Sequence, residues 1–437
     1  MLLVDPPNHC LRGPGSAQHV HPLGLGYVAA ALSPHHDVVQ LVPDVRDDFD
    51  GDPWLAIGDT IAAARPDLVG LTAVTSTFPS ARRVARLARE RLGPDVPIVL
   101  GGVHATTLPE AGFAEPAIDF VVRGEGEATV VELVRALEAG GSIDAIPGLW
   151  RRTMDGVRHG HERPAERDLD RLSFPRREGI LWPEWLQPGL YQSVITLRGC
   201  PYACIYCAVP GSTDKKTRYR SPANVADEVA LLRDRYDVPY VFFHDSVFTL
   251  HRGRTLELCD ELERRDLRVP FCCQTRTDRV DPELLGRLRA AGCHQIFFGI
   301  ESGDVESLRR MRKSMPLAEI RAAVAEVKRL GIRCSGFFIV GFPWETAEHI
   351  RNTADFATDI GLDGVSLFSA TPLPGTELWE MSAAHELPDA IDFRSPQVNL
   401  TSMPHAEYAA LFREVRARMD QYNQACMKAA LEHWPKG

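Results

Sequence analysis

Short apolar runs alternate with longer stretches of helical periodicity along the first third of the chain. Each run is followed by apolar residues spaced three and four apart, as on one face of a helix. This alternation predicts parallel strands joined by crossover helices. The expected strands are Leu2–Val4, Val38–Val42, Leu68–Leu71, Ile98–Leu100 and Phe120–Val122. We therefore expect residues 1–140 to form a doubly wound, flavodoxin-like (Rossmann-like) domain that binds its ligand at the carboxyl ends of the strands.

The pattern changes between residues 141 and 190. This stretch is rich in proline, arginine and aspartate, and its clearest feature is a possible β-hairpin around Leu149–Val157. Such a composition favours turns and loops over a packed core. We expect residues 141–190 to be a linker between two domains.

The alternation resumes at residue 191 with a longer repeat. Ser221 with Pro222 favours a helix start, and Gly292 favours a helix end. Six strand–helix units predict an α/β domain, a partial (β/α)6 TIM barrel over residues 191–375, with its chemistry at the carboxyl ends of the strands. The expected strands are Ser193–Leu197, Tyr240–His244, Phe271–Gln274, Gln295–Ile300, Gly336–Val340 and Gly364–Ser369. Residues 376–437 should form a short helical C-terminal segment.

Composition narrows the range of partners. The 437 residues carry a formal net charge of −10, which argues against a general attraction to nucleic acid. No apolar run approaches the length of a membrane span. The N-terminus also lacks the basic region and cleavage site of a signal peptide. We expect a cytoplasmic protein with no nucleic acid and no membrane partner.

Three cysteines stand close together at the start of the second domain. Cys200, Cys204 and Cys207 follow the spacing CxxxCxxC, directly after the first strand expected in the barrel. Cysteine thiolates are the usual ligands of iron–sulfur clusters, and a cluster of four irons takes four. Three cysteines would leave one iron open to a small molecule. The alternative is a zinc site completed by another residue, such as His244.

Polar residues follow every strand expected in the barrel. The carboxyl ends of parallel barrel strands share one rim, where catalytic groups gather. We therefore expect these side chains to form one site. The segments of this group are His244–Ser246, Gln274–Arg276, Gly299–Gly303 and Gly341–Glu345, together with Ser369 and Thr371.

The cysteine run, with Tyr206 before its last cysteine, resembles the signature of the radical S-adenosylmethionine enzymes. The resemblance implies a 4Fe-4S cluster held by Cys200, Cys204 and Cys207 as the catalytic and metal-binding residues. In that family the open iron binds S-adenosylmethionine, and one electron from the cluster splits the sulfonium to give a 5′-deoxyadenosyl radical. The resemblance also implies an external electron donor such as flavodoxin or ferredoxin.

This resemblance covers residues 191–375. Gly299–Gly303 is similar to the segment that contacts the ribose and methionine parts of S-adenosylmethionine in the family, and Gly336–Gly341 is similar to the strand near the adenine. Asp245-Ser246 stands where the family has a glycine-glycine-glutamate-like segment, and departs from it. Arg276 is a candidate partner for the carboxylate of S-adenosylmethionine. The implied cofactor-binding residues are Tyr206, Asp245, Ser246, Arg276, Glu301, Ser302, Gly341 and Ser369.

The loops of the first domain are similar to those of cobalamin-binding domains fused to such barrels. In those domains the matching loops surround the corrin and its nucleotide tail, and glycines allow the backbone to approach closely. The implied cobalamin-binding residues are Thr75, Ser76, Thr77, Gly101, Gly102, His104, Gly124, Glu125 and Gly126. We expect a bulky side chain at Gly102 to take the space of the cofactor.

One motif of the first domain departs from the cobalamin pattern. Many cobalamin domains carry Asp-x-His-x-x-Gly, in which the histidine ligates cobalt and the aspartate orients it. Here His21 and Gly24 fit that pattern, but His19 replaces the aspartate. A ligating imidazole normally has an acceptor that orients it. His21 therefore either ligates cobalt or lines the pocket, and we predict that it is not a firm ligand.

Both resemblances together point to the cobalamin-dependent radical S-adenosylmethionine enzymes. They imply methylation of an unactivated carbon in a small molecule, with cobalamin as the methyl carrier. The alternative in the same scaffold is rearrangement, deoxygenation or cyclisation without methyl transfer. Methylthiolation of RNA or protein is less favoured, because the N-terminal region lacks three further cysteines for a second cluster. A cobalamin carrier without enzyme activity would leave the cysteine run unexplained.

Overall fold

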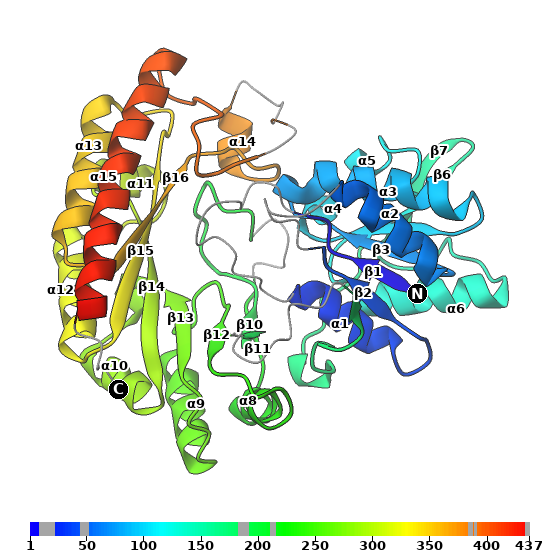
Figure 1. The fold of residues 1–437 in the computed structure, drawn as a ribbon, viewed down its shortest axis with the longest axis horizontal. Coiled ribbons are helices and arrows are strands. Elements are labelled where there is room, and N and C mark those ends of the chain that lie inside the picture. The colour runs from blue at the N-terminus through cyan, green and yellow to red at the C-terminus, as the bar shows by residue number, and fades with distance from the viewer. Residues whose placement is uncertain are drawn as a thin grey trace. The chain divides into compact units, whose positions relative to one another are not determined.

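The computed structural model describes residues 1–7, 22–43, 52–181, 192–209, 216–382, 388 and 391–432. The chain divides into two compact units, and each is considered by itself. Unit 1 comprises Met1–Gln187, Ala208–Arg218 and Pro388–Ile391. Unit 2 comprises Pro188–Cys207, Tyr219–Leu387 and Asp392–Gly437. In both units, helices cover a sheet that is mainly parallel (Figure 1).

Unit 1 is built on an eight-stranded sheet with the order β7-β6-β5-β4-β3-β1-β2-β8. The strands are β1 (Leu2–Val4), β2 (Val39–Leu41), β3 (Val69–Thr72), β4 (Ile98–Gly101), β5 (Phe120–Val122), β6 (Leu149–Thr153), β7 (Gly156–His159) and β8 (Ile180–Leu181). All neighbours from β8 to β5 pair in parallel. The order β2-β1-β3-β4-β5 is the expected flavodoxin-like one, and its topological switch point lies between β1 and β3.

Helices pack on both faces of this sheet because its central strands are apolar on both sides. In β1, Leu2 and Val4 belong to the core that contains residues of α2 and α3, whereas Leu3 belongs to the core that contains residues of α1 and α6. The helices of unit 1 are α1 (Leu23–Leu32), α2 (Pro53–Ala64), α3 (Phe78–Leu92), α4 (Val103–Thr107), α5 (Pro109–Gly112) and α6 (Gly126–Ala139). The expected doubly wound architecture is confirmed.

Part of the segment expected as a linker joins the sheet of unit 1. Strand β6 pairs antiparallel with β5, and β7 pairs antiparallel with β6, which forms the hairpin predicted around residues 149–157. Strand β8 pairs with β2 at the other edge. All four residues of β7 are exposed, and β8 has only two residues. Neither strand therefore shows the apolar pattern from which a strand is predicted.

Unit 2 contains a six-stranded sheet, all parallel, with the order β16-β15-β14-β13-β12-β9. The strands are β9 (Gln192–Val194), β12 (Val241–Phe243), β13 (Phe271–Thr275), β14 (Cys293–Glu301), β15 (Arg333–Val340) and β16 (Gly364–Ser369). The main helices are α8 (Pro222–Tyr236), α9 (Arg252–Arg264), α10 (Pro282–Ala290), α11 (Val305–Arg310), α12 (Leu317–Arg329) and α13 (Ala347–Asp359). Each strand neighbours the next one along the chain, as expected for a partial (β/α)6 barrel.

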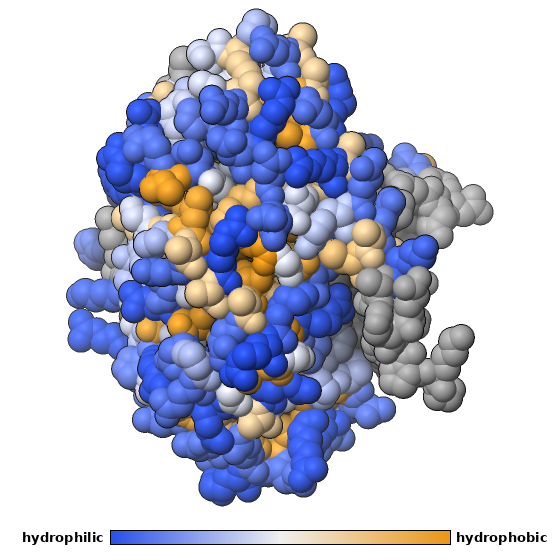
Figure 2. All heavy atoms as spheres, turned by 90° about the vertical axis from the view of Figure 1, so that its left-hand side faces the viewer, coloured by the Kyte–Doolittle hydropathy of each residue, from blue (hydrophilic) through white to orange (hydrophobic). Residues whose placement is uncertain are grey.

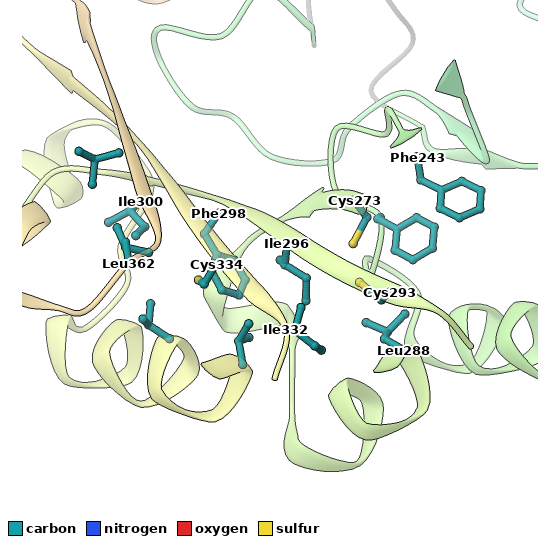
Figure 3. Close-up of a cluster of buried hydrophobic side chains, with 14 of the residues drawn as sticks. Phe243, Cys273, Leu288, Cys293, Ile296, Phe298, Ile300, Ile332, Cys334 and Leu362 are labelled. Atoms are coloured by element: carbon teal, nitrogen blue, oxygen red, sulfur yellow. The ribbon is translucent and has the colours of Figure 1, made fainter. Parts of the chain in front are cut away.

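The core of unit 2 lies between the strands and their helices. Figure 3 shows Ile296, Phe298 and Ile300 of β14 within this core, close to Cys334 of β15. These four side chains are fully buried. Because successive side chains of a strand point to opposite faces, the alternate residues of β14 lie on the inner face of the barrel.

The C-terminal segment contains α14 (Glu377–Met381) and α15 (His405–Glu432), which confirms that it is mostly helical. Helix α15 packs on β16 and α13. The amide of Asn423 accepts a hydrogen bond from the backbone N–H of Val365 and donates one to its carbonyl, both at 2.8 Å. Figure 2 shows the side of the molecule on which α12, α13 and α15 lie, where smaller apolar areas interrupt a mainly hydrophilic surface. No helix of the described residues is both long and apolar enough to cross a membrane.

Candidate active site

The three cysteines lie on a loop that follows the first strands of unit 2. Cys200 is buried and the other two are partly buried, and none of the three forms a disulfide. The N–H of Cys207 donates to the carbonyl of Cys204 at 3.1 Å, which tightens the end of the loop. Ile205 fixes the middle, since its N–H donates to Met311 and its carbonyl accepts from Leu378. Backbone contacts at Cys204 and at the residue that follows it therefore hold the loop in place.

Asp245, which we expected to bind a cofactor, holds the chain that leads into this loop. Its side chain is 1% exposed, and one carboxylate oxygen accepts from the N–H groups of Thr196 (2.7 Å) and Leu197 (3.1 Å). The other oxygen accepts from the hydroxyl of Thr196 at 2.7 Å. Both oxygens are thus used within the protein, so the geometry gives Asp245 a positioning role. Ser246, the next residue, is exposed.

Arg276 lies beside the cysteine loop. Its guanidinium stacks 4.1 Å from the ring centre of Tyr202, which stands between the first two cysteines. Two of its nitrogens donate to the carboxylate of Asp278 at 2.8 Å. The third nitrogen, Nη1, is buried and has no hydrogen-bond partner among the described residues. A buried donor without a partner is costly, so Nη1 is available for an acceptor on a bound molecule.

Glu301 forms a buried ion pair with Lys313, a residue that our sequence analysis did not single out. The two charged groups are 2.6 Å apart and both side chains are less than a tenth exposed. Lys313 also lies 3.5 Å from the hydroxyl of Tyr206. Burial raises the pKa of the Cys200 thiol, whereas the charges of Lys313 and Arg276 lower it. Lys313 therefore brings a positive charge close to the cysteine loop.

The backbone at the end of β14 is shaped around this ion pair. Glu301 has a φ of 74°, and the pairing register of β14 with β15 shifts between Gly299 and Glu301. A Cβ on Gly299 would lie 2.7 Å from both Glu301 Oε1 and Lys313 Nζ, so a side chain there would displace the ion pair. Left-handed backbone in a residue other than glycine is unusual and concentrates at functional sites.

Three other expected residues contact neighbouring helices. The hydroxyl of Ser302 bonds to Thr353 of α13 at 3.0 Å. The hydroxyl of Ser369 bonds to Tyr408 of α15 at 2.7 Å. Gly341 has a φ of 98°, and a Cβ there would collide with the Tyr408 hydroxyl. These contacts fix the rim of the barrel, and the N–H of Gly341 donates to the buried carboxylate of Glu345 at 2.7 Å.

Glu345 gives a pH-dependent prediction. Burial raises its pKa from 4.5 to about 7. Between those values the folded protein keeps a proton that the unfolded chain releases, so the free energy of unfolding falls as the pH rises. Glu345→Gln keeps an acceptor for the loop and removes this titration. We expect the variant to be more stable than the wild type at pH 8, by up to about 3 kcal/mol, and similar at pH 5.

Urea unfolding of both proteins from pH 5 to pH 8 checks this prediction. The wild type should lose stability between pH 5 and pH 7 relative to Glu345→Gln. If the free energy of unfolding changes with pH equally in the two proteins, the prediction is contradicted.

In unit 1, the expected loops after β3 and β4 contact each other. The ring of His104 stacks on Phe78 with centres 4.0 Å apart, and its Nδ1 lies 3.3 Å from the hydroxyl of Thr75. Burial lowers the pKa of His104 to about 4, so the imidazole is neutral at pH 7. Its Nε2 is buried and has no partner among the described residues. Ser76 and Thr77 complete the 3-10 turn that begins at Thr75.

Gly102 is held against the loop that follows β3. Its φ is 95°, and a Cβ would lie 2.6 Å from the carbonyl oxygen of Ala73 and 2.7 Å from Thr72 Oγ1. The expectation that a side chain there would take the space of a cofactor is therefore wrong, because the protein itself occupies that space. Around Gly101, by contrast, a Cβ would meet nothing closer than 3.9 Å.

The loop after β5 is tied to the loop after β4. The hydroxyl of Thr106, which sequence analysis missed, donates to Gly102 and accepts from the N–H of Gly124. Glu125 pairs with both terminal nitrogens of Arg218, at 2.5 and 3.0 Å, so its carboxylate is already engaged. Gly124 has a φ of 87° with open space where a Cβ would stand. Gly126 is the first residue of α6. His19 and His21 lie outside the described residues.

The side chains of the two units suit the cofactors that the sequence implies. Three cysteines without disulfides on one loop suit an iron–sulfur cluster, in which each iron takes its own thiolate. In the described part of the chain, no three His, Cys, Asp or Glu side chains come together to share a single metal ion, as a zinc site requires. His244, the candidate fourth zinc ligand, is exposed. The unused Arg276 Nη1 and His104 Nε2 provide polar contacts for bound molecules.

Comparison with known proteins relates both units to known families. A model of the radical SAM superfamily matches residues 194–357, and a model of the B12 binding domain matches residues 15–134. An uncharacterised methyltransferase of Pyrococcus horikoshii is 30% identical over 99% of this chain and 95% of that protein. The anaerobic magnesium-protoporphyrin IX monomethyl ester cyclase of Rubrivivax gelatinosus is 31% identical over 87% of this chain and 69% of that protein.

Among solved structures, the radical S-adenosylmethionine methyltransferase TsrM from Kitasatospora setae matches with a TM-score of 0.72. It is 24% identical, and the match covers 86% of this chain and 74% of TsrM. At this identity the match establishes a shared fold.

Proposed function

Because this chain belongs to the radical S-adenosylmethionine superfamily and carries a B12-binding domain, we propose that it methylates an unactivated carbon of a small molecule. The observation that carries the proposal is the loop of three cysteines without disulfides at the rim of the barrel, in a chain that also contains the cobalamin-type unit. When bound, the cluster, S-adenosylmethionine and cobalamin supply the electron transfer, the hydrogen abstraction and the methyl delivery.

In this proposal the residues of unit 2 hold two of the three cofactors. Cys200, Cys204 and Cys207 bind three irons of the cluster. Arg276 offers the free Nη1 to an anionic group such as a carboxylate. The ion pair of Lys313 with Glu301 orients the charged methionine part of S-adenosylmethionine, since a paired lysine and carboxylate present both a donor and an acceptor.

Residues of unit 1 bind cobalamin through the three loops joined by Thr106 and by the stacked ring of His104. The neutral imidazole uses Nε2 for a polar group of the cofactor, because that nitrogen otherwise stays buried without a partner. His21 stays a prediction: we expect no firm bond from it to cobalt. An external one-electron donor, such as flavodoxin or ferredoxin, completes the proposal.

The relatives support methylation and leave one alternative. The Pyrococcus relative is named a methyltransferase, and TsrM is described as a methyltransferase with a tryptophan substrate. The Rubrivivax relative is named a cyclase. Cyclisation of a small molecule in the same scaffold is therefore the second candidate.

Anaerobic reconstitution with iron, sulfide and hydroxocobalamin tests the proposal. The reconstituted protein should show cluster and corrin absorbance after desalting, and should form 5′-deoxyadenosine from S-adenosylmethionine with a chemical reductant. With S-adenosylmethionine labelled at its methyl group, a product that carries the label supports methylation. A product without the label, formed together with 5′-deoxyadenosine, favours cyclisation or rearrangement. Protein that retains no corrin contradicts the cobalamin half of the proposal.

A further inference from the structure

Four phenylalanines form a row across the inner face of the barrel. This aromatic strip consists of Phe242 of β12, Phe297 of β14, Phe337 of β15 and Phe368 of β16. Their ring centres follow one another at 5.6, 5.8 and 6.2 Å. The rings of Phe297 and Phe337 are stacked, at 8°, and the other two pairs are tilted, at 44° and 54°. The row reaches across five neighbouring strands, which spans on the order of 15–20 Å.

The strip lies on the side of the sheet opposite the helices. Its members alternate with fully buried residues of the core, such as Phe338 and Phe298, of which Figure 3 shows the latter. Each strip residue is only partly buried. Among the described residues, none of the four belongs to a hydrophobic core. Large aromatic side chains that stay partly open to solvent in line with an active site are typical of ligand-binding surfaces.

The strip is continuous with the candidate active site. Gly299 follows Phe297 on the same face, and a Cβ there would touch both partners of the Glu301–Lys313 ion pair. Ile339 follows Phe337 on the same face and packs against the same buried cluster as Tyr206. The opposite border is polar, because Gln295 donates to the hydroxyl of Ser335 at 3.1 Å. The strip is thus an apolar layer that begins directly below the charged groups of the rim.

We infer that the aromatic strip receives the substrate, and that the substrate contains an extended, flat, apolar ring system. The apolar surface and the width of the row match fused or conjugated rings better than a small polar metabolite, since aromatic rings pack edge-to-face or offset-stacked against a planar apolar molecule. The ion pair above the strip would then lie near the edge of the ring system that faces the cofactors. This inference rests on the proposed function only in placing the substrate within the barrel.

Binding of a fluorescent ring probe to the reconstituted 437-residue chain tests the inference. The probe is 8-anilinonaphthalene-1-sulfonate, and the variants are Phe297→Ser and Phe337→Ser. Each removes an aromatic contact, so we expect the probe to bind roughly tenfold more weakly. Phe337→Leu keeps apolar area and should retain most of the binding. Met427→Ser, which changes an exposed apolar residue on α15, serves as the matched control.

Thermal unfolding and iron content show whether a variant loses probe binding because its fold is damaged. If the strip faces a ligand, the serine variants should melt close to the Met427→Ser control and keep their iron. Unchanged probe binding overturns the inference. A large drop in melting temperature also overturns it, because the phenylalanines would then be filling a core. Probe binding needs no turnover, so a failure of methyl transfer leaves this result standing.

Discussion

The triple variant Cys200→Ala, Cys204→Ala, Cys207→Ala should bind no cluster and should form no 5′-deoxyadenosine from S-adenosylmethionine. The three thiols are the only cysteines of the described loop, and each iron that they hold would lose its protein ligand. Each single variant should lose most of the iron as well. Iron and sulfide content, absorbance and product analysis after anaerobic reconstitution provide the measurement.

Cys426→Ala is the matched control for this experiment. Cys426 lies on α15, is partly buried and contacts the hydroxyl of Tyr422 and the carbonyl of Leu362, the latter at 3.7 Å. Its replacement should leave iron content unchanged. The triple variant should still bind cobalamin, since the loops expected to bind it belong to unit 1. Near-normal iron and 5′-deoxyadenosine in the triple variant would falsify the cluster assignment.

Gly102→Ala should abolish cobalamin binding through damage to the protein rather than by filling the space of the cofactor. The new Cβ would press on the backbone of Ala73, whose carbonyl accepts from the N–H of His104 at 3.0 Å. The loops after β3 and β4 would separate, and the stack of His104 on Phe78 would be lost. Corrin absorbance after desalting should disappear, while the iron content of the protein should stay normal.

Gly93→Ala is a close control for that variant. Gly93 has a φ of 85° and a ψ of −175°, and Gly102 has a φ of 95° and the same ψ. A Cβ on Gly93 meets nothing within 4 Å. Both variants carry the strain of a backbone region that suits glycine, about 1–3 kcal/mol, but only Gly102→Ala adds the collision. Equal loss of corrin in the two variants would show that strain alone is responsible.

The strands were predictable because buried parallel strands leave a strong apolar signal. Leu2–Val4 and Gly364–Ser369 coincide with the predicted strands. Strand β7 was predicted only as half of a hairpin, since an exposed edge strand follows no apolar pattern. The loops at the strand ends were also predictable, because chemistry at the carboxyl ends follows from the topology of parallel sheets.

The pairing of side chains within the site was not predictable. Lys313 stands in an arginine-rich stretch that reads as a solvated surface, and its burial depends on Glu301, which lies on another element. Asp245 and Glu125 look like free carboxylates in the sequence, yet Thr196 and Arg218 engage them. These partners lie far apart in the sequence and meet only in the folded protein, so a local sequence pattern does not predict them.

The contact of Asn423 with β16 has a consequence for the behaviour of the protein in solution. An open barrel ends in a strand whose N–H and carbonyl groups can recruit a strand from another molecule, a route to aggregation. By imitating the hydrogen bonds of a neighbouring strand at Val365, the amide of Asn423 makes part of that edge unavailable. Helix α15 therefore disfavours self-association through β16. A chain that ends before residue 405 would lack this helix and expose the edge of β16, and we expect it to associate more readily.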